Sequence, residues 1–392
     1  MKVLADTIHG IIDLDDMQTE LIAQPELQRL TWLLQLSFTK LVFPGANHSR
    51  LEHSIGCSHL ARKIADQLEL TKDEKRTVIA SGLLHDIGHS PLSHILEKFS
   101  PVSHEQLASR IITGKEKLHL PSSGQIPSIL ESHGLNPEKI GAIICGNQKN
   151  YLGNIISGDI DADRLDYLLR DAYYTGVSHG NIGIERIIKM LKIKDGKICV
   201  LEKGVRSVEE MLLARMQMYP AVYWHHAARI AGLMLAKATS PIIDHIPYFS
   251  SLNDFEFIEK LRTLGPFQKE TIERLLNRKL YKRAFVATPI ELKKYPKIES
   301  LLQKPSEIEE KISSSLGIDK NHIIIDARSS AKKVEPLNIP VIRKDGSLID
   351  IKEISSLAGA VYKKESLQPI FSVYTPSENR EKVHDFVKNL IQ

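Results

Sequence analysis

Apolar residues recur three and four positions apart through most of the first 240 residues. This spacing puts them on one face of a helix, and it runs from about residue 20 to residue 238. Short loops rich in Gly, Pro, Ser and Asn interrupt the pattern. We therefore predict a mostly α protein with a large helical body.

Capping boxes mark the starts of two predicted helices, because in such a box a hydroxyl and a Glu carboxylate each accept from a free backbone N–H. Ser49-Arg-Leu-Glu52 begins the helix that carries His53, and Thr71-Lys-Asp-Glu74 begins the next long helix. This second helix should end near Gly88. Ser90-Pro91 then predicts the N-cap and first turn of a further helix.

Strand signals occur near the N-terminus, after residue 190 and near the C-terminus. Residues 2–14 and 191–201 are typical of hairpins at the periphery of the helical body, the second with a tight Asp195-Gly196 turn. From His322 onward, short apolar segments predict strands before a closing helix near residues 381–391. We expect three parts: a helical body (1–240), a helical extension (241–320) and a small C-terminal α+β lobe (321–392).

Composition indicates a globular protein without a strong global charge. Of 392 residues, 42% are hydrophobic and 26% charged, and the net charge is only +4, so any basic feature must be local. Cys57, Cys145 and Cys199 are far apart in sequence, which favours a reducing compartment and argues against a cysteine-based zinc site. No apolar run approaches a membrane span and no signal peptide is evident, so we expect a cytoplasmic protein.

A His-Asp pair stands at the end of an apolar helix, in the segment Gly82–His89. Because adjacent helical residues point about 100° apart, His85 and Asp86 can offer an imidazole and a carboxylate to one point, where a metal ion would bind both. Chance produces such a dipeptide often, and a His that caps a helix is the ordinary explanation. The metal interpretation is strengthened by His53, in the first turn of its helix with Arg50 one turn earlier.

Asp163, Tyr167 and Asp171 follow one another at four-residue steps, which places them in one polar stripe along a predicted helix. A solvated face is an equally good explanation for a charged stripe taken alone. Here the other face is apolar, with Leu165 and Leu168, so the stripe can instead line a cleft.

The candidate metal ligands are two His and two Asp, without a thiolate: His53, His85, Asp86 and Asp163. This set suits a divalent ion, namely manganese, magnesium, iron or zinc, with positions left for water and substrate. Such an ion activates water and polarises a phosphoryl oxygen, which predicts a hydrolytic reaction.

Arginines and proton donors complete the candidate site. The planar guanidinium suits phosphate oxygens, and the arginines beside or downstream of the metal set are Arg50, Arg164 and Arg215. Each alone is more often part of a surface ion pair. His94 and Glu97, on the helix expected after Pro91, and His104 are candidates for proton transfer. For His104, a capping or core role is the competing explanation.

This series of motifs resembles the H-D family of deoxynucleoside triphosphate triphosphohydrolases, which includes bacterial enzymes and the vertebrate enzyme with a sterile alpha motif. The likeness extends from Lys2 to about Lys282. It rests on the segments Asp6–Gly10, Pro25–Leu30, Val42–Ser54, His85–His94 and Asp161–Asp171. The resemblance implies an HD helical body and a reaction in which water attacks the α-phosphorus and releases a nucleoside and intact triphosphate.

The resemblance also implies roles for individual residues, and its metal ligands coincide with the four named above. The residues that would hold the triphosphate are Arg50, Arg164 and Arg215. Those around the scissile bond would be His89, His94 and His104, with His94 as the proton donor to the leaving oxygen. The sugar 3′-hydroxyl would be recognised by Gln35, Tyr167 and Asp171. Tyr223 would pack on the sugar itself.

Members of this family are often oligomers that nucleotides activate at subunit junctions. The positions that match contacts to activating nucleotides are Lys2, Gln28, Arg278 and Lys282. Ala23 and Thr31 stand where guanine-regulated members have an Asp and an Arg, so the match for guanine recognition is incomplete. The resemblance implies a dNTP substrate, an activating nucleotide and a homo-oligomer, specifically a tetramer. Neither nucleic acid nor a membrane is an expected partner.

Two alternatives remain open on the sequence. Another HD-type hydrolase, such as a cyclic-nucleotide or guanosine-tetraphosphate phosphodiesterase, would use the same metal set, although Tyr167, Asp171 and Tyr223 argue against it. A nucleic-acid-binding regulatory protein that kept the metal site is suggested by the basic run 274–283. Salt-dependent binding of single strands without nucleotide turnover would support that alternative.

Overall fold

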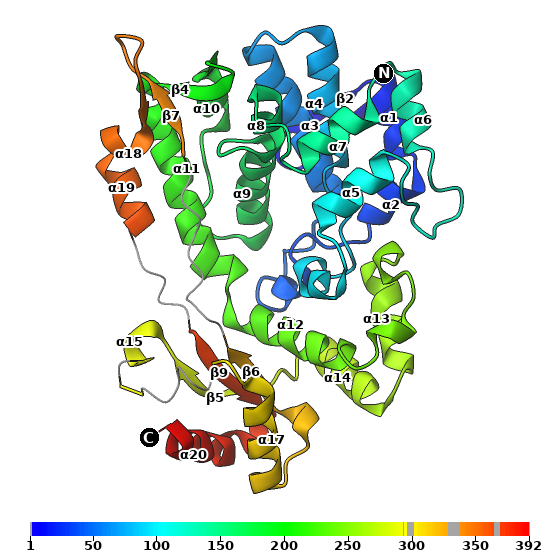
Figure 1. Cartoon of the computed structure of the whole chain (residues 1–392), viewed down its shortest axis with the longest axis vertical. Helices are drawn as coiled ribbons and strands as arrows, with labels where there is room; N and C mark the ends of the chain where they lie inside the picture. Colours follow the sequence, from blue (N-terminus) through cyan, green and yellow to red (C-terminus); the bar gives the residue numbers. More distant parts are fainter. Residues whose placement is uncertain (1, 293, 296–301, 328–337, 364–368, 392) are drawn as a thin grey trace. The chain divides into compact units, whose positions relative to one another are not determined.

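The structure is a computed structural model, and it describes residues 2–292, 294–295, 302–327, 338–363 and 369–391. The chain forms two compact units (Figure 1), each assembled from separated stretches of sequence. Unit 1 consists of Met1–Tyr223, Pro247–Phe257 and Pro336–Tyr362. Unit 2 consists of Trp224–Ile246, Ile258–Glu335 and Lys363–Gln392. The three-part division expected from the sequence stays a prediction.

Helices dominate the fold, which confirms the predicted mostly α class with a C-terminal α+β part. The helices of unit 1 are α1 (Asp16–Ile22), α2 (Pro25–Leu30), α3 (Arg50–Gln67), α4 (Lys72–Leu84), α5 (His104–Ile112), α6 (Ile126–Ser132), α7 (Pro137–Ile144), α8 (Tyr151–Ser157), α9 (Ala162–Thr175), α10 (Ile184–Lys189), α11 (Val205–Met218), α18 (Ile351–Ile354) and α19 (Ser356–Lys363). α13 (Asp254–Thr263) begins in unit 1 and continues in unit 2. The other helices of unit 2 are α12 (His226–Thr239), α14 (Pro266–Leu276), α15 (Pro289–Leu292), α17 (Pro305–Leu316) and α20 (Arg380–Ile391). Among the described residues, none of these helices has the length and apolarity that crossing a membrane requires.

The helices that position the candidate site are α3, α4 and α9, and α3 packs against both of the others (Figure 1). Both predicted capping boxes are present, at Ser49 with Glu52 and at Thr71 with Glu74. Apolar side chains of the three helices are fully buried in two clusters, for example Leu60, Leu83 and Leu165. The polar residues of these helices are therefore held on a packed scaffold.

The strands in the described part of the chain form three separate sheets. The hairpin β1 (Lys2–Asp6) and β2 (Gly10–Leu14) is antiparallel. The second predicted hairpin, β3 (Leu191–Lys194) and β4 (Lys197–Leu201), turns at Asp195 and Gly196, both with positive φ, and belongs to a four-stranded sheet in the order β3-β4-β7-β8. Its other strands are β7 (Pro340–Ile342) and β8 (Leu348–Asp350). In unit 2, β5 (Lys282–Ala287), β6 (Ile324–Ala327) and β9 (Phe371–Thr375) are antiparallel in the order β5-β9-β6. The predicted C-terminal strands thus divide between two sheets.

The N-terminal hairpin has mostly exposed strands, as its predicted peripheral position implies, but its turn contacts α9. At its turn, His9 Nε2 lies 2.7 Å from Asp166 Oδ1, and Asp6 accepts from Arg170 Nη1 at 2.9 Å. Asp166 and Arg170 have no exposed surface. The hairpin is therefore attached to the buried side of α9.

The α-helix predicted after Pro91 is absent. Two short 3-10 turns stand there instead, Ser93–Ile95 and Glu97–Phe99. Leu92 and Ser93 have φ values of 53° and 52°, in the left-handed region, and an α-helix of L-residues cannot continue through them.

Candidate active site

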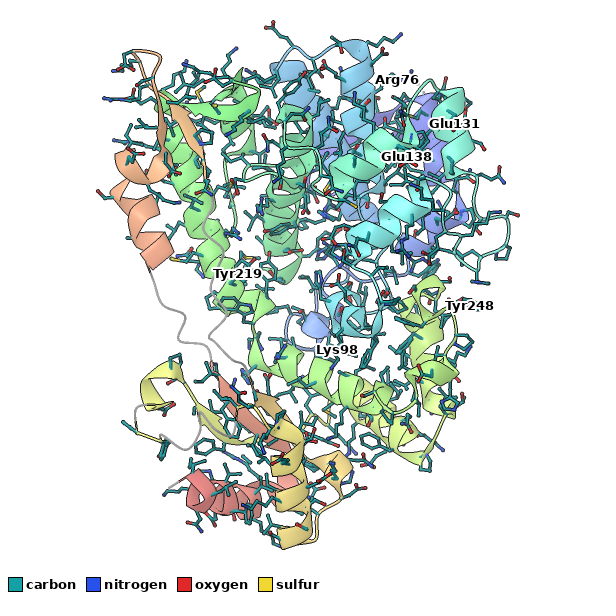
Figure 2. The ribbon with its side chains drawn as sticks, in the orientation of Figure 1. Arg76, Lys98, Glu131, Glu138, Tyr219 and Tyr248 are labelled. Atoms are coloured by element: carbon teal, nitrogen blue, oxygen red, sulfur yellow. The ribbon has the colours of Figure 1, made fainter. Side chains whose placement is uncertain are left out.

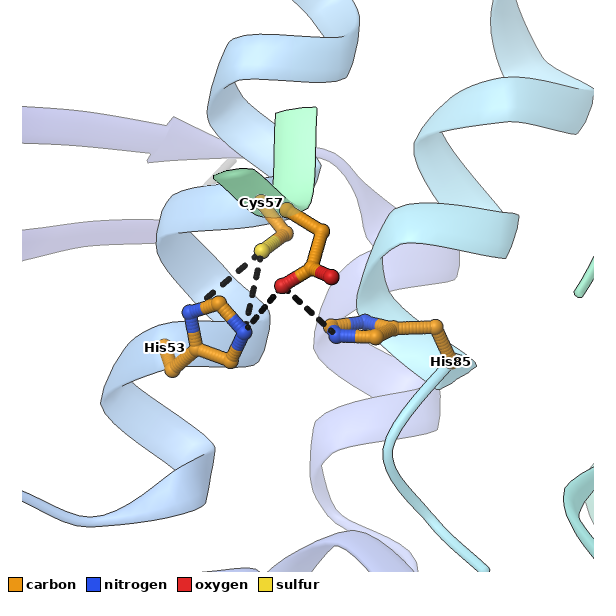
Figure 3. A group of neighbouring side chains, drawn as sticks. His53, Cys57 and His85 are labelled. Carbon is orange, nitrogen blue, oxygen red and sulfur yellow. Dashed lines mark hydrogen bonds and ion pairs between the residues drawn. The ribbon is translucent and has the colours of Figure 1, made fainter. Parts of the chain in front are cut away.

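The four predicted metal ligands lie together in unit 1, and Figure 3 shows two of them, His53 and His85, facing one another. His53 Nε2 lies 3.0 Å from Asp163 Oδ1. His85 Nε2 lies 3.9 Å from that oxygen and 3.2 Å from Asp86 Oδ1. Ligand atoms that each lie about 2.1 Å from one ion are about 3 to 4 Å apart, so the separations among His53, His85 and Asp163 fit a shared divalent ion. Asp86 contacts His85 but belongs to a neighbouring group with His89 and His104.

His85 is oriented by the backbone of its own helix. Its Nδ1–H donates to Gly82 O at 2.8 Å, which fixes the tautomer and leaves the Nε2 lone pair directed at the cluster. Nε2 is buried and accepts no hydrogen bond from any described residue. A buried acceptor without a donor is costly, so a cation at this position explains its orientation.

His53 is oriented by a buried carboxylate. Its Nδ1–H donates to Asp166 Oδ2 at 2.7 Å, and Asp166 accepts from Arg170 Nε at 2.8 Å and Nη2 at 2.9 Å. Burial lowers the pKa of His53, but its hydrogen bonds to Asp163 and Asp166 act in the opposite direction, and the pKa lies well above its usual value. Both ring nitrogens therefore face negative groups. A bound metal ion would take the place of the Nε2 proton.

Gly56 on α3 leaves space for the Asp166 and Arg170 side chains that orient His53. A Cβ at this position would overlap Asp166 Oδ1 and Arg170 Nη2. The close approach of α3 to α9 therefore requires a residue without a side chain at position 56.

Cys57 lies closer to the metal set than we expected from the sequence. Its Sγ is 3.5 Å from both ring nitrogens of His53, so it contacts the ring as Figure 3 shows. Burial raises the pKa of the Cys57 thiol well above its usual value, and a protonated thiol is a poor metal ligand. The set of four ligands without a thiolate stays a prediction.

Arg50 is the arginine closest to the metal set. Its Nη1 donates to Asp86 Oδ2 at 2.5 Å, while Nε and Nη2 donate to Ser93 Oγ at 2.9 and 2.7 Å. Burial would raise the pKa of Asp86, but His85, Arg50 and His89 hold it well below its usual value. Asp86 is therefore a carboxylate at neutral pH, as a metal ligand must be.

The histidines predicted at the scissile bond form one cluster beside Asp86. His89 stacks on His104 with ring centroids 3.8 Å apart, and His94 lies edge-on to both. Glu97 accepts from His104 Nδ1 at 2.6 Å and from His94 Nδ1 at 2.9 Å. These two hydrogen bonds lower the pKa of Glu97. Burial opposes protonation of His104, but Glu97 and Asp86 raise its pKa overall.

A second polar group surrounds Asp171, two turns along α9 from Asp163. Asp171 Oδ2 accepts from Tyr223 Oη at 2.9 Å, and Oδ1 lies 2.8 Å from His48 Nε2. The Tyr167 ring is edge-on to that of Tyr223, with centroids 6.1 Å apart. Asp171 and His48 are buried.

Gln35 belongs to the loop beside this group, since its backbone N–H donates to His48 O at 3.0 Å. Its side-chain Oε1 is buried and has no hydrogen-bond donor among the described residues. An unpaired acceptor in a buried position fits a residue that receives its donor from a ligand.

The other two predicted phosphate-binding arginines differ in their surroundings. Arg164 donates to Asp161 Oδ2 at 2.9 Å and to Gly158 O. Arg215 is buried, and its guanidinium lies over the Tyr219 ring at 5.5 Å from the centroid. Tyr219, labelled in Figure 2, begins the π-helical turn Tyr219–Tyr223 that follows α11.

The predicted regulatory residues are all exposed. Lys2 on β1 and Gln28 on α2 belong to unit 1, and Arg278 and Lys282 belong to unit 2. A regulatory site that contains all four stays a prediction.

Comparison with known proteins identifies the family. Residues 50–171 match the model of the HD domain, and residues 182–392 match that of the HD associated region. An uncharacterized protein of Methanocaldococcus jannaschii is 35% identical over 98% of this chain and 81% of its own length. The chain belongs to the HD-domain phosphohydrolase family.

Two further similarities concern proteins with named activities. The deoxynucleoside triphosphate triphosphohydrolase SAMHD1 homolog of Dictyostelium discoideum is 31% identical over 72% of this chain and 59% of that protein. A solved structure of a phosphohydrolase from Bacteroides thetaiotaomicron has a TM-score of 0.75 at 26% identity, and the match covers 96% of this chain and 100% of that one. HD domains bind a divalent metal, and the structure has side-chain groups able to hold one: His53, Cys57, His85 and Asp163 form one such group, and Asp86, His89 and His104 form another.

The residues that orient the predicted ligands were not predicted from the sequence. Asp166 and Arg170 occupy α9 four residues apart, and this spacing was readable as an i, i+4 ion pair. His48 and Ser93 flank predicted residues but give no sequence signal of their own. Their roles depend on contacts with Asp171 and Arg50, which are distant in sequence.

Proposed function

We propose that this HD-domain protein hydrolyses deoxynucleoside triphosphates to a deoxynucleoside and inorganic triphosphate. The observation that carries the proposal is the polar group around Asp171, on the same helix as Asp163. Helical rise places Tyr167 and Asp171 about 6 and 12 Å from Asp163 along the α9 axis. The sugar of a nucleotide would lie in this interval when its α-phosphate is at the metal set.

The protein's side chains would divide the reaction between them. A divalent ion on His53, His85, Asp86 and Asp163 would polarise the α-phosphoryl oxygen and lower the pKa of water. Arg50 is held by Asp86 and Ser93 and would neutralise phosphate charge from a fixed position. Arg164 and Arg215 would contact the remaining phosphates.

Proton transfer would fall to His94. Its side chain is 70% exposed, and its Nδ1–H donates to Glu97, so in the imidazolium form the proton on Nε2 could pass to the leaving 5′ oxygen and leave a neutral ring bonded to Glu97. Glu97 also holds His104, which places a second imidazole in the same cluster. Proton transfer by a positioned histidine is worth about 10²- to 10⁴-fold in rate.

Sugar recognition would rest on Asp171, Gln35, Tyr167 and Tyr223. Asp171 and the unpaired Gln35 Oε1 offer acceptors for the 3′-hydroxyl. Tyr223 is fixed by its hydrogen bond to Asp171, so its ring would close over the C2′ edge of the sugar and leave no room for a 2′-hydroxyl.

We also propose a homo-oligomer, specifically a tetramer, in which Lys2, Gln28, Arg278 and Lys282 bind an activating nucleotide. The support is the resemblance in sequence together with the exposure of all four side chains. We expect the protein in the cytoplasm.

The test is a product analysis of metal-loaded protein with each dNTP and the matching NTP. Triphosphate and deoxynucleoside from dNTPs, with far slower turnover of NTPs, is the expected result. Pyrophosphate with a nucleoside monophosphate, or turnover of cyclic nucleotides alone, would replace the proposal with another HD-type reaction.

A further inference from the structure

A buried carboxylate from outside the HD domain is bonded to two loops of the candidate site. Asp254 belongs to the segment Pro247–Phe257 and is only 3% exposed. Its Oδ2 accepts from the backbone N–H of Leu34 at 2.9 Å, and its Oδ1 accepts from that of Leu92 at 2.6 Å. One side chain therefore joins two loops that are far apart in sequence.

The bond to Leu92 holds an unfavourable backbone conformation. Leu92 and Ser93 are consecutive left-handed residues, which cost energy for residues other than glycine. This conformation points Ser93 Oγ at Arg50, where it accepts from Nε and Nη2. The position of the Arg50 guanidinium therefore depends on a turn that Asp254 stabilises.

The bond to Leu34 acts on the sugar side of the site. Leu34 directly precedes Gln35, whose backbone N–H donates to His48 O and whose Oε1 is buried without a donor among the described residues. His48 in turn contacts Asp171. A shift of the Leu34 backbone would thus move the predicted acceptor for the 3′-hydroxyl.

We infer that Asp254 is a positioning residue. Through Leu92 it holds the loop that orients Arg50, and through Leu34 it holds the loop that carries Gln35, so the two loops keep one relative position. This inference rests on the proposed function. Asp254 lies outside residues 50–171, which match the HD domain, so the HD-associated region contributes to the geometry of the site. Among the described residues, the Asp254 side chain is hydrogen-bonded to no metal ligand and to no predicted substrate contact. It acts through the two loop amides.

Arg29 is also hydrogen-bonded to the segment Pro247–Phe257 that carries Asp254. Its Nη1 donates to Leu252 O at 3.0 Å, and its Nη2 donates to Ile87 O at 3.0 Å and His89 O at 2.8 Å. Burial lowers the pKa of Arg29 to about 10, and the nearby charge of Asp254 acts in the opposite direction. A cation and an anion, each bonded to backbone groups, therefore connect this segment to residues 87–92, which directly follow the His-Asp pair.

The test is Asp254→Asn in the full chain, with Asn253→Ala as the matched control. The amide keeps one acceptor but turns an NH₂ group toward the other backbone N–H, so one loop is released. Misplacement of reacting groups by about 1 Å can cost on the order of 10²-fold, so we expect kcat for dNTPs to fall about 10- to 100-fold. Metal content should stay at the wild-type level, because Asp254 is bonded to none of the predicted metal ligands, which lie on α3, directly after α4 and on α9.

The control residue adjoins Asp254 but does not reach the site. Asn253 Oδ1 accepts from the N–H groups of Phe255 and Glu256, both at 3.0 Å, and so caps α13. Loss of this cap should lower Tm by a few degrees and leave kcat within about twofold of wild type. A purely structural role for Asp254 would make the two variants behave alike.

Hydrogen exchange gives a readout that needs no turnover. In the wild type, the amides of Leu34 and Leu92 should exchange slowly although they lie outside α-helices, and Asp254→Asn should speed exchange of at least one of them tenfold or more. Fast exchange of both amides in the wild type would overturn the inference even if the variant fails to fold. An active wild type with unchanged kcat in the folded variant would also overturn it. A wild type that hydrolyses no dNTP would instead refute the proposed function.

Discussion

For Gly56→Ala, helix propensity predicts a gain in the free energy of unfolding, whereas the structure predicts a loss. In the interior of a helix, replacing Gly with Ala stabilises by about 1 kcal/mol. In α3, however, the new methyl group would overlap Asp166 Oδ1 and Arg170 Nη2. Overpacking costs about 1–3 kcal/mol and breaking a buried ion pair costs about 3–5 kcal/mol, so after the gain in helix propensity we expect a net loss of about 3–7 kcal/mol.

The same substitution should weaken metal binding, because Asp166 orients His53. Loss of such an orienting partner typically reduces metal affinity about 10- to 100-fold. Thermal unfolding and metal content after dialysis measure the two effects. The matched control is Gly359→Ala in α19, where the nearest atom to the new Cβ would be Lys352 O at 3.9 Å; this variant should be as stable as the wild type or more stable. If Gly56→Ala is stabilised like the control and keeps its metal, the proposed orientation of His53 by Asp166 and Arg170 is refuted.

Four further outcomes are expected. His85→Ala should lose both bound metal and turnover while the protein stays folded, and retained metal would contradict the ligand assignment. Removal of the metal by a chelator should lower Tm of the wild type, since an ion that binds only the folded state stabilises it, whereas His85→Ala should show no such shift. Tyr223→Ala should narrow the dNTP-to-NTP ratio of kcat/KM by admitting the ribonucleotide, while Asp171→Ala should weaken both substrates; an unchanged ratio in folded Tyr223→Ala would sink the sugar-gate hypothesis. Charge reversal at Lys2 or Arg278 should reduce activation by added nucleotide, and a monomer in light scattering with and without dNTPs would contradict the proposed tetramer.

Periodicity and capping predicted the helices well because both are local properties. The capping boxes at Ser49 and Thr71 and the turn at Asp195-Gly196 are present as expected. The strand segments after His322 were recognisable, but their distribution over two sheets was not, because pairing of β7 with β4 joins residues about 140 positions apart.

The predicted helix after Pro91 is wrong because a contact with a residue distant in sequence determines the conformation there. Ser90-Pro91 is a valid helix start by composition, but the amide of Leu92 is taken by Asp254, which is 162 residues away in sequence. The polar stripe on α9 was likewise recognised only in part. Asp163, Tyr167 and Asp171 were predicted from their spacing, while Asp166 and Arg170 on another face are buried because the N-terminal hairpin covers them with Asp6 and His9.

The central claim is that a metal-loaded HD site directs water to the α-phosphorus of a deoxynucleotide. The most direct measurement is hydrolysis of a dNTP in ¹⁸O-labelled water, followed by mass spectrometry of both products. Cleavage of the bond between the α-phosphorus and the 5′ oxygen should place one ¹⁸O in the released triphosphate and none in the deoxynucleoside. Label in the deoxynucleoside, or the appearance of labelled monophosphate or pyrophosphate instead of triphosphate, would contradict the account.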